Sequence, residues 1–387
     1  EILSILESEC RLFEKILSDV NPDFLVSLDF GLHNSNLLTK ICQKKGIKIL
    51  SISVSKFTNR CYLSEFTDTL MDESVRDNQE LSFQDLQNLL SENNLSKSLN
   101  TVYSTVRKSN LTRISAGIPL LLGENNNINT NFAYYGRTKS KLISSEIKNL
   151  LRTWYRGNFL SKNSQKVIKN EKYVYLPLHQ EPERSLLIDA PFYTNQIELI
   201  RHVAKSIPIH YLLYVKEHPT QGKARGWRPI SEYKQILEIP NVKLIDPSVS
   251  SMDLIKNSDL VITVSGTASF EALIYEKPSI IFANYGYQKA GISKIDCLED
   301  LPKIIKETIN SKVDLKRLNS YVENLIHNSF EFDYYGFQIR SGDEFFHNGH
   351  IQDIEIEEEK MNTFLQKEKQ NFELITNAHL KFIESNN

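Results

Sequence analysis

The sequence is poor in cysteine and has no cysteine pair. Its four cysteines, Cys10, Cys42, Cys61 and Cys297, show neither a CxxC motif nor a regular spacing, which excludes a disulfide framework and a zinc knuckle. Isolated thiols are typical of proteins in a reducing compartment. We therefore expect a cytoplasmic protein.

The sequence also lacks a long apolar run and an excess of charge of one sign. No stretch of about 18 apolar residues occurs, and the N-terminus has no signal-peptide pattern. The 46 Lys and Arg residues nearly balance the 48 Asp and Glu residues, for a net charge of −2, so no overall field favours nucleic acid. The chain begins with Glu1 instead of Met, and we expect it to be a piece of a longer protein.

Several motifs of common enzymes are absent. GxGxxG, GxxxxGK[ST] and GxSxG do not occur, which leaves P-loop and hydrolase functions unsupported. His347 and His350 lie near Asp343 and Glu344, but not in the HExxH frame of a helical zinc site. We predict no metal site.

The chain does have enough apolar residues for two domains. Of its 387 residues, 40% are hydrophobic, and a single core rarely grows past about 250–300 residues. Residues 24–30 and 47–54 are apolar runs typical of strands, with a helical pattern between them. This unit predicts a Rossmann-like domain over residues 1–165, with a helical insertion at about residues 72–113.

The second half alternates strands and helices more regularly. Strands are predicted at residues 173–178, 211–216, 242–245, 260–264 and 279–282, and helices at residues 193–206, 230–237, 251–257 and 268–275. This alternation predicts a doubly wound parallel sheet over residues 172–312, which binds ligands at the carboxyl ends of its strands. A mainly helical, acidic tail follows over residues 313–387.

The most informative segment is LVITVSGTASFEA, residues 260–272, where a strand runs into Ser265, Gly266 and Thr267 and then a helix. Glycine allows a ligand close to the backbone, hydroxyls donate hydrogen bonds, and a helix N-terminus attracts phosphate. Glu271 lies about one turn later, within reach of ribose hydroxyls. The alternative is a tight turn with a Ser or Thr cap.

Two further predicted strands end in polar clusters. After the strand at residues 211–216, Lys216 and His218 offer positive charge and a proton donor for a phosphate, although a lone histidine there is more often structural. After the strand at residues 173–178, Gln180, Glu181 and Glu183 offer a sugar contact or a carboxylate base. A solvated loop is the alternative for this second cluster.

The first domain carries a corresponding cluster. Asp29 ends its first strand, His33 and Asn34 open the next helix, and Arg60 follows the second strand. Asp29 is a candidate general base, and Arg60 a candidate ligand of an acidic sugar. The alternative is that Asp29 and Asn34 only cap the helix.

Residues 139–156 form a basic amphipathic helix that carries Trp154 and Tyr155. Such a helix fits an anionic polymer or the edge of a membrane. A solvated helix face is the alternative.

Five segments together resemble the capsule polysaccharide biosynthesis family. They are PLHQEPE (177–183), APFYTNQIELI (190–200), YVKEHP (214–219), NVKLIDPSVSS (241–251) and VSGTASFEALIYEKPSIIF (264–282). That family is similar to bacterial Kdo transferases of capsule assembly and, more distantly, to GT-B sialyltransferases.

The resemblance implies an α/β, GT-B-like fold of two Rossmann-like doubly wound domains that face a cleft. The C-terminal domain would bind a CMP-activated acidic sugar, and the N-terminal domain the acceptor glycan. His218 and residues 265–267 would hold the phosphate, and Glu271 the ribose. Asp29 or Glu181 would act as the base, with His33, Asn34, Arg60, Gln180 and Glu183 near the acceptor or sugar.

The leading hypothesis is therefore a metal-independent glycosyltransferase that moves a Kdo-like or sialic-acid-like sugar from CMP to a surface polysaccharide or glycolipid. It would need no cofactor beyond the nucleotide-sugar substrate. Its place would be the cytoplasm or the inner face of the inner membrane, beside capsule assembly or export machinery. The alternatives are a UDP-N-acetylglucosamine 2-epimerase and a non-catalytic polysaccharide assembly or export protein.

Overall fold

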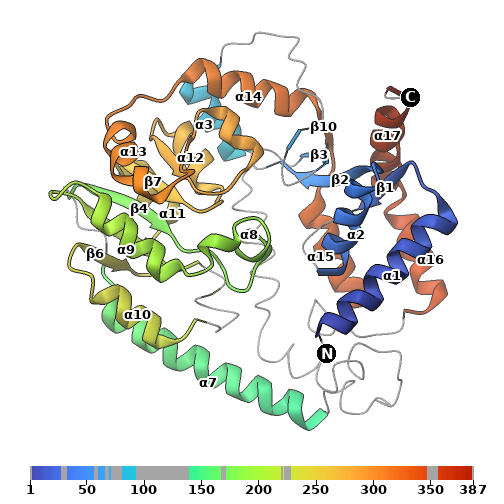
Figure 1. Ribbon diagram of the computed structural model, residues 1–387, viewed down its shortest axis with the longest axis horizontal. Helices are drawn as coiled ribbons and strands as arrows, with labels where there is room; N and C mark the ends of the chain where they lie inside the picture. Colours follow the sequence, from blue (N-terminus) through green and yellow to red (C-terminus); the bar gives the residue numbers. More distant parts are fainter. Residues whose placement is uncertain are drawn as a thin grey trace.

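The chain forms two β-sheets, each flanked by helices (Figure 1). The computed structural model describes residues 2–27, 33–55, 60–65, 69–70, 81–92, 139–166, 171–218, 221, 228–346 and 356–385. Within these residues, one sheet has six strands and the other has four. This confirms the predicted α/β class with two sheet-containing units.

The four-stranded sheet contains the N-terminal strands and has the order β1-β2-β3-β10. Its strands are β1 (Phe24–Ser27), β2 (Lys48–Val54), β3 (Arg60–Ser64) and β10 (Ser329–Glu331). β1 and β2 are parallel and α2 (His33–Lys44) joins them, as the strand-helix-strand pattern predicted. β3 and β10 pair antiparallel, so this sheet is mixed.

Helices α1 (Ile2–Val20) and α2 flank the parallel pair. Leu17 of α1, Cys42 of α2 and Ile49 of β2 are buried together. Helix α7 (Lys139–Asn163) contains the predicted basic helix and continues seven residues past its predicted end at Arg156.

The six-stranded sheet is parallel throughout, with the order β6-β5-β4-β7-β8-β9. Its strands are β4 (Tyr173–Pro177), β5 (Leu212–Lys216), β6 (Val242–Ile245), β7 (Leu260–Thr263), β8 (Ser279–Ile281) and β9 (Ser293–Lys294). Counted along this unit, the order is 3-2-1-4-5-6, that of dinucleotide-binding folds. Successive strands are therefore added first on one side of β4 and then, from β7 on, on its other side. The position between β4 and β7 is the switch point of the sheet.

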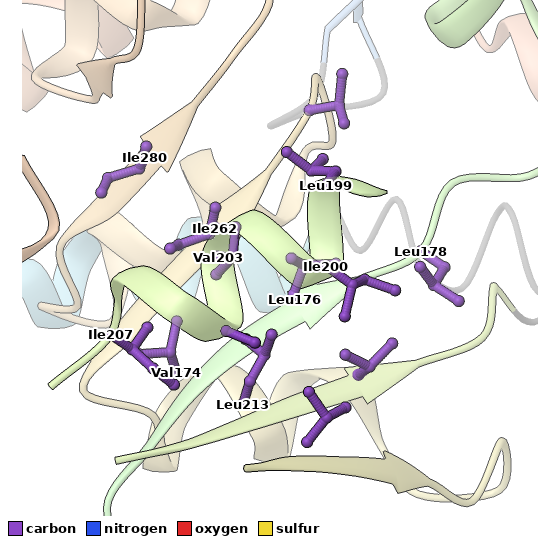
Figure 2. Packing of buried hydrophobic residues seen from close by; sticks show 14 of the residues in the cluster. Val174, Leu176, Leu178, Leu199, Ile200, Val203, Ile207, Leu213, Ile262 and Ile280 are labelled. Carbon is purple, nitrogen blue, oxygen red and sulfur yellow. The ribbon is translucent and has the colours of Figure 1, made fainter. Parts of the chain in front are cut away.

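Four helices of this unit lie where the periodicity predicted them: α9 (Gln196–Ser206), α10 (Ile230–Leu237), α11 (Ser251–Asn257) and α12 (Ala268–Ile274). Two more, α8 (Arg184–Leu187) and α13 (Leu301–Thr308), were not predicted. Figure 2 shows α9 with Ile200 and Val203 directed at Leu176, Leu213 and Ile262 of the sheet. Each such fully buried side chain contributes about 1.5–3 kcal/mol, so this face is the main core.

The C-terminal tail connects the two units. Helix α14 (Leu315–His327) buries Leu318 and Val322 against residues of α12. The tail then forms β10 and the helices α15 (Tyr334–Phe345), α16 (Glu358–Lys367) and α17 (Lys369–Ser385), and Phe332 joins the apolar cluster of β2 and β3. The tail is mainly helical, as predicted, but it also completes the N-terminal sheet.

Helix α3 (Phe83–Glu92) lies in the predicted insertion and packs on the six-stranded unit. Leu86 is fully buried, and the Gln87 side chain donates to the Ile274 carbonyl of α12 at 3.1 Å. Among the described helices, none is both long and apolar enough to cross a membrane.

Candidate active site at the sheet switch point

Three strand ends meet where the sheet order reverses. β4 leads into His179, β5 into Lys216 and His218, and β7 into Ser265. Because the strands are parallel, their carboxyl ends share one edge, and ligands of such sheets bind there. The clusters predicted from the sequence after these strands therefore lie at one site.

His179 bridges the switch point. Its Nε2 atom lies 3.0 Å from the Thr263 hydroxyl and accepts the Ser265 backbone N–H at 3.3 Å. Burial, together with the nearby charges of His218 and Arg228, lowers the pKa of His179 to about 3. The ring is thus neutral, with its Nε2 lone pair facing the loop, and it serves to fix the loop in place.

Position 266 requires a glycine, because the Thr263 side chain lies very close to its backbone. A Cβ atom at this position would lie 2.6 Å from the Thr263 hydroxyl oxygen and 3.5 Å from His179 Cε1. The same hydroxyl accepts the Gly266 backbone N–H at 3.0 Å. The amides of Ser265 and Gly266, predicted to face a phosphate, therefore bond within the protein and stiffen the turn.

Ser265 carries an unused hydrogen-bonding group. Its side chain is 6% exposed, and its hydroxyl has no hydrogen-bond partner among the residues that the structure describes. The Tyr287 hydroxyl donates to the Ser265 carbonyl from the other side of the loop. A buried hydroxyl without a partner costs about 1–3 kcal/mol, so a ligand that bonded Ser265 would remove this cost.

The other predicted nucleotide ligands surround this loop. Lys216 is buried and donates to the Ser251 hydroxyl at 2.8 Å, at the start of α11. His218 is half-buried near His179. Burial raises the pKa of Glu271, while a hydrogen bond from the Thr267 hydroxyl, 3.2 Å away, opposes this rise.

A cluster of ion pairs centred on the buried Arg228 side chain lies next to the site. The Arg228 guanidinium has no exposed surface and contacts Glu217 at 2.8 Å, Glu232 at 2.8 Å and Glu181 at 3.2 Å. Burial lowers the pKa of Arg228, but these carboxylates outweigh it and raise the pKa above its usual value. The cluster spans the ends of β4 and β5 and the start of α10.

Glu181 lies at the edge of this cluster, where it also accepts from the Gln196 side chain. Gln196 in turn pairs with the His179 backbone, so Glu181 and His179 are positioned together. Gln180 is buried, whereas Glu183 is exposed and accepts from the Ser185 hydroxyl at 3.0 Å. Their roles in acceptor or sugar binding stay predictions.

The candidates from the first domain are more scattered. Asp29 lies outside the described residues. His33 is exposed, and its ring contacts Glu9 at 3.0 Å. Asn34 is also exposed, and its side-chain oxygen accepts a hydrogen bond from the Ser35 backbone N–H. Arg60 donates to the Ser329 hydroxyl at 2.7 Å and pairs with Glu331, which ties β3 to β10.

A cavity of about 480 Å³ lies between α14 and the segment Gly286–Ala290. Lys289, Lys316 and Arg317 line it together with a single acid, Asp314. Its lining thus has an excess of positive charge. The described part of the chain holds no group of three or more metal-ligating side chains, and His347 and His350 lie outside it.

Sequence reasoning missed the residues that position the site. Arg228, Gln196, Thr263, His179 and Glu217 were not predicted as functional, nor was Tyr233, whose hydroxyl donates to Glu217. Arg228 follows a polar stretch without periodicity, and its partners are up to 49 positions away. The sequence did contain one local signal for the site, namely the many polar residues directly after each strand.

The chain was compared with known proteins. The family model described as "Capsule polysaccharide biosynthesis protein" matches residues 124–328, more than half of the chain. No curated protein matches.

Among solved structures, KpsC of Thermosulfurimonas dismutans, a beta Kdo 2,7 transferase, is 13% identical over 80% of this chain and 78% of that one, with a TM-score of 0.36. The UDP-GlcNAc 2-epimerase of Methanocaldococcus jannaschii is 17% identical over 83% and 80%, with a TM-score of 0.33. S. aureus MnaA with UDP is 12% identical over 89% and 81%, with a TM-score of 0.31.

Proposed function

Because the chain belongs to the capsule polysaccharide biosynthesis family, we propose that it is a glycosyltransferase that transfers a sugar from a nucleotide donor to a surface polysaccharide or glycolipid. The donor we propose is a CMP-linked acidic sugar of the Kdo or sialic-acid class, as the sequence resemblance implies. The observation that carries the proposal is the loop at the switch point, where the buried Ser265 hydroxyl has no hydrogen-bond partner within the described part of the chain.

The donor phosphate would bind at the strand ends. Lys216 supplies a fixed positive charge at the end of β5, and His218 lies close enough to His179 to interact with it. As the bond between the sugar and the phosphate breaks, negative charge develops on the leaving CMP, and positive groups held in place stabilise it without reorganisation. Glu271 would accept a hydrogen bond from the ribose.

The acceptor hydroxyl must lose a proton as it attacks the sugar. We propose Asp29 or Glu181 as the carboxylate that takes it. Glu181 is 28% exposed and is oriented by Arg228 and Gln196. The cationic cavity lined by Lys289, Lys316 and Arg317 suits an acidic sugar or an acidic glycan.

Calorimetric titration with CMP, CDP, UDP and GDP tests the donor assignment. We expect selective binding of CMP that is weakened at least tenfold in Ser265→Ala, which loses the hydroxyl, and in Glu271→Ala, which loses the carboxylate that would accept from the ribose. The matched controls are Ser18→Ala and Glu307→Ala, which remove the same groups from exposed positions and should bind as the unaltered protein does.

The other outcomes each overturn part of the proposal. Selective binding of UDP would replace it with an epimerase or a UDP-sugar transferase. Binding of none of the nucleotides would replace it with a non-catalytic assembly protein. Normal binding of CMP by both site variants would place the nucleotide elsewhere. If CMP binds, His218→Ala should lower the rate of sugar transfer at least tenfold.

A further inference from the structure

Helix α7 presents two different faces along its length. Its 25 residues lie along one edge of the molecule, beside α10 (Figure 1). Arg156 and Leu160 are each 2% exposed, and the Phe159 ring lies 6.4 Å from the Tyr233 ring of α10. These residues form the inner face, which fixes the helix to the six-stranded unit.

The outer face is apolar and exposed. Ile147, Leu150, Leu151 and Trp154 follow the spacing i, i+3, i+4 and i+7, which places them on one stripe. With Tyr155, these side chains are between 51% and 70% exposed. Arg156 and Leu160 lie on the opposite side of the helix, so the stripe points away from the protein core.

The charge of this helix differs from that of the whole chain. Residues 147–163 contain four cations and no acidic residue, whereas the full sequence has slightly more acids than bases. Lys148 lies beside Tyr155 on the flank of the stripe, and Arg152, one turn further on, lies between this flank and the inner face. Both are exposed.

We propose that the outer face of α7 binds the surface of an anionic lipid bilayer. Leucine and isoleucine would enter the boundary of the acyl chains, the aromatic rings would sit at the level of the headgroups, and the cations would lie among lipid phosphates. Each such cation strengthens binding by about fivefold. This inference does not depend on the proposed sugar donor.

The charge pattern favours lipid over other occupants. A second copy of α7 would bring two cationic flanks together, which disfavours self-association. Helix α1 also exposes apolar residues, Leu3 and Leu12 among them, but it carries more acids than bases. An anionic surface would therefore repel α1 and attract α7.

Co-sedimentation of the full chain with vesicles tests the proposal. The vesicles are phosphatidylcholine alone and an equal mixture of phosphatidylcholine and phosphatidylglycerol, in about 0.01 M and about 0.15 M salt. We expect binding to the anionic vesicles that weakens at least tenfold in neutral vesicles and weakens with salt. Binding should also shift the tryptophan emission to shorter wavelength, and Trp154→Phe should abolish most of that shift.

Two double variants locate the contact. Lys148→Gln with Arg152→Gln should weaken binding by about thirtyfold, and Leu151→Ser with Trp154→Ser by at least tenfold. Since these side chains are exposed, the urea midpoint should not change. The matched control, Leu3→Gln with Leu12→Gln on α1, should bind as the unaltered protein does.

Absence of binding to anionic vesicles at low salt would overturn the proposal. Equal binding to neutral vesicles would also overturn it, as would unchanged binding by both α7 variants or equal loss in the α1 control. A dimer in size-exclusion chromatography that Leu151→Ser with Trp154→Ser abolishes would make this face a contact between copies instead.

Discussion

Replacement of Arg228 by methionine should be the most destabilising single change at the site. Methionine keeps the length of the side chain and removes the charge that three carboxylates share. Glu217, which has no exposed surface, would then be left buried without its closest cation. Breaking a buried ion pair from one side costs about 3–5 kcal/mol, and we expect a loss in the free energy of unfolding of this size.

The double variant Arg228→Met with Glu217→Gln separates the charge from the packing. It removes both members of the closest pair, so no ionised carboxylate is left alone at that point. We expect it to be about 2 kcal/mol more stable than Arg228→Met, because contacting residues couple by about 0.5–3 kcal/mol. The Tyr233 hydroxyl, which donates to Glu217, can donate equally to the amide oxygen of glutamine.

Urea denaturation followed by circular dichroism provides the free energies, provided the slopes with urea agree between variants. The matched control is Arg11→Met, because Arg11 pairs with Glu7 on the surface of α1 with 77% of its side chain exposed. It should show no measurable change. A loss below about 1 kcal/mol in Arg228→Met, or an additive double variant, would refute the assignment of a coupled buried cluster.

Three further predictions concern other parts of the chain. The pKa of His179 in the folded protein is about 3, far below the usual value, so the free energy of unfolding should rise with pH between about 3 and 6.5. His179→Gln should reduce that slope by up to about 1.4 kcal/mol per pH unit, and an unchanged slope in urea denaturation at several pH values would contradict this. Gly266→Ala should weaken nucleotide binding at least tenfold in calorimetry, since its Cβ would meet a hydroxyl at 2.6 Å, whereas Gly157→Ala, with open space around it, should bind normally. Phe332→Ala should cost about 3–5 kcal/mol in urea denaturation, because Phe332 is 3% exposed, while Phe192→Ala, at 77% exposed, should have no measurable effect.

The regular part of the fold was predictable because its signals are local. In the second half, each strand is a short apolar run and each helix has its own periodicity, so that residues 230–237, 242–245 and 251–257 match the observed elements in full. β10 was not predictable in this way. It has only three residues, Ser329–Glu331, and its partner strand β3 lies about 270 positions earlier.

The candidate site was predictable as a set of strand ends, but not as a set of contacts. Polar residues after each strand indicated where a ligand would bind, since parallel strands share one edge. The pairing of His179 with Thr263, 84 positions apart, depends on the strand order. No local pattern encodes that order, and the same limit applies to the partners of Arg228.

The β3–β10 pairing affects how the protein is made. During synthesis the N-terminal end of a chain leaves the ribosome first and begins to fold as it emerges. β3 then presents an unpaired edge with Cys61, Tyr62 and Leu63 until the strand Ser329–Glu331 has been translated. An unpaired edge is a template for pairing with another chain. A ribosome-bound or truncated product that ends before residue 329 is therefore expected to associate with itself or to need a chaperone.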